Sequence, residues 1–281
     1  MISNTANTGI SSFHETNRVI IKGAGVAYLL PHPALRAWIS NYTITFPTEC
    51  AMSDGYTVIP HGCATLVLAW DGRRFFCNLF GSSTKPVCVG DEANICQTLF
   101  ITEFHPGGYY AFSGLPQHEL TDCVIPFDTI NPAMHRLMAH QLEAAPDLHG
   151  LVAEMDRLFL AHLRVSSFRP EFSEASQMIV NSGGLVSVRE LSQNVFISQR
   201  HLNRVFREYI GVNAKSFSRL VRVNRALRFL RRRDYSLSRA SMETGFYDVP
   251  HFIHDFKSIC GVTPQEYRDN MSDFYSEVAK F

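Results

Sequence analysis

The stretches "HLNRVFREYIGV" (residues 201–212) and "HFIHDFKSICGV" (residues 251–262) follow one pattern. Both begin with His, carry Phe and then a basic residue at the sixth and seventh positions, and end in Gly-Val, whereas the residues between diverge. A repeat with constant apolar positions predicts two helices that share a buried side and differ on the exposed side.

The first copy is predicted to be an amphipathic helix over residues 198–209. Its apolar side chains recur at i, i+3, i+4 and i+7, and they are Leu202, Val205, Phe206 and Tyr209. A second stripe with the same spacing is polar and basic, and it consists of Arg200, Asn203, Arg204 and Arg207. Ser198 stands at the N-cap position, and Gly211 stands where a C-terminal cap is expected. An ordinary basic surface helix would have the same stripe, so this copy alone leaves both interpretations open.

A shorter helical pattern precedes each copy. A short helix, a brief turn and a second helix with a polar outer side form the helix-turn-helix arrangement, in which the second helix enters the major groove. We therefore predict helix-turn-helix units at residues 187–209 and 236–259. The helical pattern between them is about 20 residues long and would span about 30 Å, close to the roughly 34 Å between successive major grooves.

The charges of the chain are unevenly distributed, although its net charge is zero. Residues 1–170 hold 10 basic and 14 acidic side chains, and residues 171–281 hold 16 and 12. Residues 185–239 alone carry a net charge of +10. Such a local basic field indicates a polyanionic partner.

Together the two units resemble the DNA-binding domain of the AraC/XylS family of transcription regulators. The most specific part of the likeness is the closing pattern of Gly245-Phe246, His251-Phe252, Phe256-Lys257, Gly261, Thr263-Pro264 and Tyr267-Arg268. The resemblance implies a sequence-specific regulator that binds double-stranded promoter DNA and contacts RNA polymerase, and that is not an enzyme. It also implies control by an N-terminal sensor or dimerisation domain.

The candidate DNA-contacting residues are Ser198, Gln199, Arg200, Asn203, Arg204, Arg207, Ile253, His254 and Lys257. Arg suits guanine and Asn suits adenine, because each can form a bidentate pair with that base. Arg207 is expected at phosphate. Ile253 and His254 stand where the family usually has Ser and Arg, and Asp255 adds a negative charge nearby. We therefore expect the first unit to dominate base readout.

Phe196 occupies a turn position at which the family favours Gly. A left-handed backbone there would cost a residue with a side chain roughly 1–2 kcal/mol. We therefore expect another turn conformation, with Phe196 in the core.

The first 130 residues are predicted to be β-rich, since short runs of Val, Ile, Phe, Tyr and Thr alternate with Gly and Pro. Asp71-Gly72 predicts a hairpin, and helical spacing follows from about residue 132. The fold class is α+β: a β-rich barrel or sandwich with closing helices, then an all-α domain of two helix-turn-helix units joined by a long helix. The predicted boundaries are 1–165 for the sensor or dimerisation domain, 166–177 for the linker and 178–275 for the DNA-binding domain.

Residues 100–130 are similar to a sensor-like domain of one subgroup of the family. That likeness implies a small-molecule effector, a homodimer or both, without identifying the effector. No His-x-His pair of a cupin metal site occurs, so we expect no metal and no cofactor.

Two alternatives remain: a DNA-alkylation-repair methyl acceptor, which carries a related DNA-binding module, and a non-DNA interaction module. The repair proteins use a zinc-bound Cys within closely spaced Cys pairs. The seven Cys of this chain are Cys50, Cys63, Cys77, Cys88, Cys96, Cys123 and Cys260. The odd number argues against a disulfide framework. No apolar run approaches the roughly 18 residues of a membrane span, and no signal-peptide pattern opens the chain, so we expect a cytoplasmic protein without membrane contact.

Overall fold

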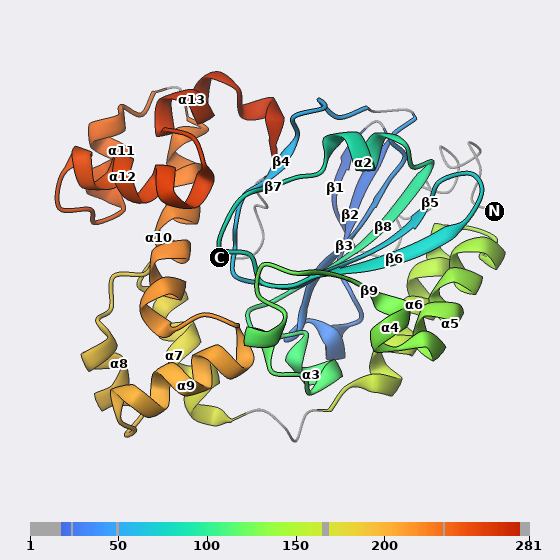
Figure 1. The fold of residues 1–281 in the computed structure, drawn as a ribbon, viewed down its shortest axis with the longest axis horizontal. Helices are drawn as coiled ribbons and strands as arrows, with labels where there is room; N and C mark the ends of the chain where they lie inside the picture. The colour runs from blue at the N-terminus through green and yellow to red at the C-terminus, as the bar shows by residue number, and fades with distance from the viewer. Residues whose placement is uncertain (1–17, 24, 49–50, 165–168, 233, 276–281) are drawn as a thin grey trace.

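The computed structural model describes residues 18–23, 25–48, 51–164, 169–232 and 234–275. A β-sheet domain with helices is followed by an all-helical domain (Figure 1). The predicted α+β class is therefore confirmed, as are the two helix-turn-helix units joined by a long helix.

Within the described residues, the larger sheet of the N-terminal domain has seven strands in the order β1-β2-β3-β8-β5-β6-β9. Its strands are β1 (Val19–Gly23), β2 (Val26–Leu29), β3 (Ile39–Thr45), β5 (Thr65–Trp70), β6 (Phe75–Phe80), β8 (Thr98–Phe104) and β9 (Val124–Pro126). All neighbouring strands are antiparallel, and β1 and β9 form the two edges. The predicted hairpin joins β5 to β6, where the Asp71 carboxylate accepts hydrogen bonds from the backbone amides of Arg73 and Arg74.

Helices cover one face of this sheet, namely α5 (Pro132–Ala144) and α6 (Leu148–His162) (Figure 1). Asp156 of α6 is buried and accepts hydrogen bonds from the Tyr42 hydroxyl at 3.0 Å and the Arg18 guanidinium at 2.7 Å. Burial and the neighbouring Asp156 carboxylate raise the pKa of Tyr42 well above its ordinary value. A smaller sheet lies apart from these helices and consists of β4 (Thr57–Val58), β7 (Val87–Cys88) and β10 (Phe274–Tyr275).

The helical domain contains α7 (Pro170–Asn181), α8 (Val188–Asn194), α9 (Gln199–Tyr209), α10 (Ala214–Leu230), α11 (Leu237–Glu243), α12 (Val249–Cys260) and α13 (Pro264–Asp269). The N-caps of α9 and α12 are Ser198 and Asp248, whose side chains each accept a hydrogen bond from the backbone amide three residues further on. Gly211 follows α9 with a φ of 99°. The apolar stripes of the two copies are buried in one core, as predicted.

The linker predicted at residues 166–177 overlaps α7, and this boundary is corrected. α7 begins at Pro170, which suits the first turn because no amide donor is needed there. Phe172 is buried, and its ring lies 4.7 Å from that of Tyr209 and 5.3 Å from that of Phe206. The helical domain therefore includes residues from Pro170 onward, and residues 165–168 lie outside the described residues.

Candidate nucleic-acid interface

Helix α9 carries six of the nine predicted contact residues at or near one exposed side. The exposed members within the helix are Gln199, Arg200, Arg204 and Arg207. Ser198 serves as the cap, since its hydroxyl accepts a hydrogen bond from the His201 amide at 3.2 Å. One nitrogen of the Arg204 guanidinium lies 3.4 Å from Nδ1 of His201. α9 therefore presents three exposed guanidinium groups.

Asn203 is less available for contact with a DNA base than the sequence suggests. It is half-buried, and its Oδ1 accepts a hydrogen bond from the backbone amide of Ala214 at 3.2 Å. Ala214 is the first residue of α10, so this bond ties the start of α10 to α9. A bidentate pair with adenine needs the same oxygen as an acceptor. In this geometry Asn203 positions helices.

The structure contradicts both predictions for Phe196, namely a turn that is not left-handed and a side chain in the core. Its backbone is left-handed, with a φ of 55°, and its side chain is 93% exposed. Gly245 stands at the equivalent turn of the second unit and is also left-handed, with a φ of 71°. Both turns therefore have the same geometry, and Phe196 adopts it despite the steric cost of its Cβ.

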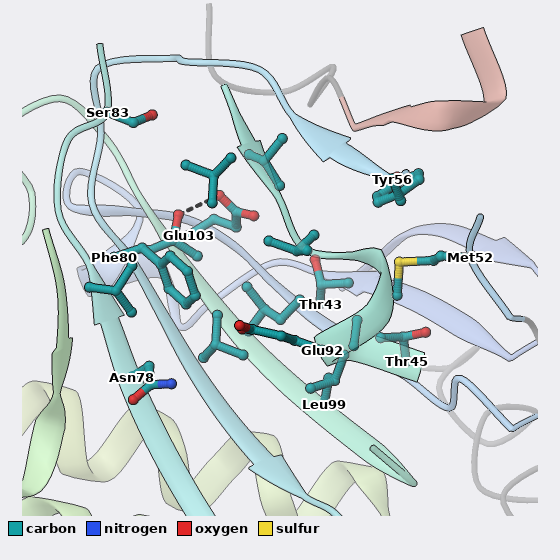
Figure 2. Close-up of a pocket in the computed structure, with 18 of the residues that line it drawn as sticks. Thr43, Thr45, Met52, Tyr56, Asn78, Phe80, Ser83, Glu92, Leu99 and Glu103 are labelled. Carbon is teal, nitrogen blue, oxygen red and sulfur yellow. Dashed lines mark hydrogen bonds between the residues drawn. The ribbon is translucent and has the colours of Figure 1, made fainter. Parts of the chain in front are cut away.

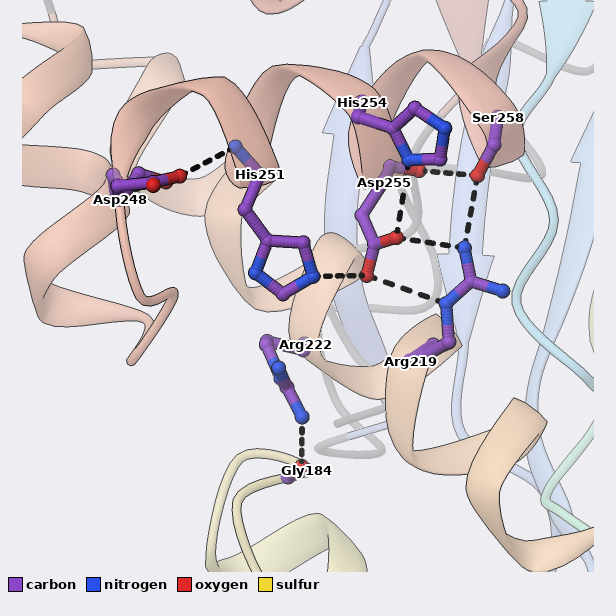
Figure 3. A network of polar contacts seen from close by, with 9 residues as sticks. Gly184, Arg219, Arg222, Asp248, His251, His254, Asp255 and Ser258 are labelled. Atoms are coloured by element: carbon purple, nitrogen blue, oxygen red, sulfur yellow. Dashed lines mark hydrogen bonds and ion pairs between the residues drawn. The ribbon is translucent and has the colours of Figure 1, made fainter.

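The second unit presents a weaker cationic surface on α12. Ile253 is half-buried, whereas His254 and Lys257 are exposed. Asp255 does not add an exposed negative charge, because it is only 6% exposed and accepts two hydrogen bonds from Arg219 of α10, at 2.8 and 3.2 Å (Figure 3). The sequence did not suggest this pair, since the partners are 36 residues apart.

Part of the basic field supports the fold. Arg222 of α10 donates a hydrogen bond to the Gly184 carbonyl at 3.0 Å (Figure 3), and its guanidinium lies 5.3 Å from the centre of the Phe246 ring. Burial lowers the pKa of Arg222, although Asp255 acts in the opposite direction. Gly184 lies just ahead of the first unit and Phe246 belongs to the second, so Arg222 connects the loop before the first unit with the second unit.

A cavity of about 770 Å³ lies in the N-terminal domain, between the larger sheet and the smaller one (Figure 2). Apolar side chains supply much of its wall, among them Val67, Leu99 and Ile101. Glu103, from β8, and Glu92, from the short helix α2 (Gly90–Asn94), extend into it. This size is typical of a site for a drug-sized ligand.

Residues 57–63, which we call the shared segment, connect this cavity with the helical domain. Ile59 is buried in the core of the helical domain. The carbonyl of Pro60 accepts a hydrogen bond from Nδ2 of Asn224, in α10, at 2.8 Å, and Gly62 lies against side chains of α10. The cavity-lining members of the same segment are Val58, His61 and Cys63. One stretch of chain therefore forms both a cavity wall and a support for α10.

The end of α9 also contacts the N-terminal domain. The Tyr110 hydroxyl donates a hydrogen bond to Oε1 of Glu208 at 3.2 Å, and the Tyr110 ring lies edge-on to that of Tyr209 at 4.4 Å. Partial burial, followed by the Glu208 charge, raises the pKa of Tyr110. The N-terminal domain therefore forms most of the cavity wall and also contacts the end of α9.

Among the N-terminal cysteines, Cys88 and Cys96 are the closest in sequence, eight residues apart, and they occupy different surroundings. Cys88 is exposed and its thiol donates to the Asp54 carbonyl, whereas Cys96 is buried and donates to the Glu92 carbonyl. Among the described residues, no group of three or more His, Cys, Asp or Glu side chains is arranged to hold a metal ion. In the same part of the chain, no helix is long and apolar enough to cross a membrane.

Comparisons with known proteins match both domains. A family model described as a helix-turn-helix domain matches residues 191–270. A second model, a domain of unknown function (DUF6597), matches residues 28–126. The first match includes α9, α10 and α12, and the second includes most of the larger sheet and of the cavity wall.

The chain is similar to the HTH-type transcriptional regulator ArgR of Pseudomonas aeruginosa, with 29% identity over 107 residues, or 38% of this chain and 32% of ArgR. The match thus spans about a third of that relative. A solved transcriptional regulator with an AraC-type DNA-binding domain, from Chromobacterium violaceum, is 27% identical over 36% of this chain and 90% of its own, with a TM-score of 0.34. ToxT of Vibrio cholerae is 11% identical over 89% of this chain and 95% of its own, with a TM-score of 0.42.

Proposed function

We propose that this chain is a helix-turn-helix transcription regulator of the AraC family and that it binds double-stranded promoter DNA with α9 as the main reading helix. The observation that carries this proposal is the exposed stripe of Arg200, Arg204 and Arg207 on α9. Arg reads guanine through two hydrogen bonds and also binds phosphate. The family is non-enzymatic.

The second unit is proposed to position the domain on the duplex. Lys257 and His254 are available to phosphate, and Ile253 offers an apolar contact to a thymine methyl group. The helix α10 has 17 residues and is therefore about 25 Å long. With α9 and α12 at its two ends, this length supports contacts in two successive major grooves, which are roughly 34 Å apart.

The N-terminal domain is proposed to control DNA binding through an effector, a second copy of the chain or both, and RNA polymerase is the protein partner that the family implies. The cavity supports a small-molecule effector. The shared segment offers a way for a bound effector to influence DNA binding. A ligand that moves His61 in the cavity wall also moves Ile59 and Pro60, which contact α10 and the core of the helical domain.

The test is a fluorescence-anisotropy titration against duplexes selected in vitro from a random pool. Loss of one bidentate contact in Arg204→Ala should weaken binding to the selected duplex about 5- to 150-fold. The same variant should lose much less affinity for unselected DNA. The matched variant with both Ile253→Ala and His254→Ala should lose less affinity for the selected duplex.

Equal losses in the two variants would contradict the dominance of α9. Affinity should also fall steeply as salt increases, because phosphate contacts release counterions. A folded protein without salt-dependent DNA binding would favour the non-DNA interaction module instead.

A further inference from the structure

We propose that the cavity of the N-terminal domain takes a lipophilic organic cation. This inference rests on the proposed effector role of the cavity, and it names the chemical class of the ligand. Its basis is a buried carboxylate that faces a mainly apolar and aromatic space.

Glu103 supplies the carboxylate. It lies on β8 opposite Thr65 of β5, and it is 2% exposed. The Thr65 hydroxyl donates a hydrogen bond to Oε2 of Glu103 at 3.3 Å, and the Glu103 side chain extends into the cavity (Figure 2). A carboxylate removed from bulk water interacts strongly with a nearby opposite charge. A ligand that carries a positive charge therefore gains more here than a neutral one.

Aromatic rings line the same space. The half-buried aromatic residues of the wall are Tyr28, Tyr56, Phe76 and Phe80. The faces of these rings carry a negative electrostatic potential, which attracts cations. The rings also pack well against the apolar groups that surround a delocalised positive charge. Aromatic rings together with one enclosed carboxylate are therefore the combination that a lipophilic cation requires.

The other charged groups of the wall also favour a positively charged ligand. Glu92 and Asp122 are exposed carboxylates of the wall, and Lys85 is the exposed ammonium among the described lining residues. His61 is a further titratable residue of the wall, and it is buried. Carboxylates thus outnumber cations around the cavity, which disfavours an anionic ligand.

The matched probes are tetraphenylphosphonium and tetraphenylborate, which have nearly the same shape and opposite charge. Isothermal titration calorimetry of the full chain, at about pH 8 and without DNA, should show one site for the cation. The anion should bind at least about tenfold more weakly. This comparison uses the wild-type chain, so it does not depend on any variant folding.

Substitutions locate the site. Glu103→Gln keeps an acceptor for Thr65 and should lower affinity for the cation about tenfold or more. Glu119→Gln, at an exposed carboxylate outside the cavity wall, is the control and should change it less than about threefold. Ile101→Trp fills the cavity and should abolish binding of the cation.

Three results would overturn the proposal: no binding of tetraphenylphosphonium, equal or tighter binding of tetraphenylborate, or unchanged binding in a folded Glu103→Gln protein. None of these results would contradict the proposed DNA binding, because the titration contains no DNA. Conversely, if the cation binds but has no effect on affinity for the selected duplex, the ligand class stands and the effector role fails.

Discussion

Replacing Phe196 by Gly is expected to stabilise the protein, although the change deletes a large aromatic side chain. A residue with a side chain pays roughly 1–2 kcal/mol for a left-handed backbone, and Phe196 has a φ of 55°. The greater conformational freedom of Gly in the unfolded chain offsets about 0.5–1 kcal/mol of this stabilisation. The ring is 93% exposed, so its loss removes little burial. The expected net gain is roughly 0.5–1 kcal/mol in the free energy of unfolding.

The assay is urea unfolding followed by circular dichroism. Phe196→Ala is the control, because it removes the ring but keeps the Cβ that causes the strain, and it should bring no such gain. Gly245→Ala makes the reverse change at the equivalent turn, where φ is 71°, and should destabilise by at least about 0.5–1 kcal/mol, because the added Cβ also meets the Leu185 side chain. If Phe196→Gly were less stable than the wild-type protein, or equal to Phe196→Ala, backbone strain at this turn would not be the explanation.

Arg207→Ala should reduce the slope of log affinity against log salt by about 1, as measured by anisotropy at several salt concentrations, and an unchanged slope would argue against a phosphate contact. Arg219→Ala removes the bidentate partner of buried Asp255 and should cost about 2 kcal/mol in urea unfolding, whereas a loss near zero would mean that water replaces the guanidinium. Ellman's reagent should modify exposed Cys88 in the native protein but leave Cys260 unmodified until denaturation, because burial raises the pKa of the Cys260 thiol; equal rates would contradict that burial.

Local signals predicted the helical domain well. The N-cap at Ser198, the glycine at residue 211 and the 3.6-residue spacing of apolar side chains define α9 within a residue of its observed bounds. The second helix of the second unit was predicted from its likeness to the first copy, and the structure adds its N-cap at Asp248. Such features depend on residues within one or two helical turns of each other, and these residues are also close in the sequence.

Tertiary features could not be predicted in the same way. The Arg219–Asp255 pair joins separate helices, and the cavity wall combines strands from the whole N-terminal domain. The prediction for Phe196 was wrong because the shared geometry of the two units outweighs the local backbone preference at the turn. The linker was drawn too long because the polar surroundings of Phe172 concealed a helix with one buried side.

The parallel pairing of β10 with β4 gives the helical domain a second attachment to the sheet domain. The first is the covalent connection after α6, and the second is made by residues 274 and 275, beyond α13. The contacts of the shared segment with α10 and of Tyr110 with Glu208 lie between these two attachments, so the helical domain is fixed along its length as well as at its ends. Deleting the chain from residue 272 onward would therefore remove the attachment at the far end, and the contacts with α9 and α10 would have to hold the orientation of α12 alone.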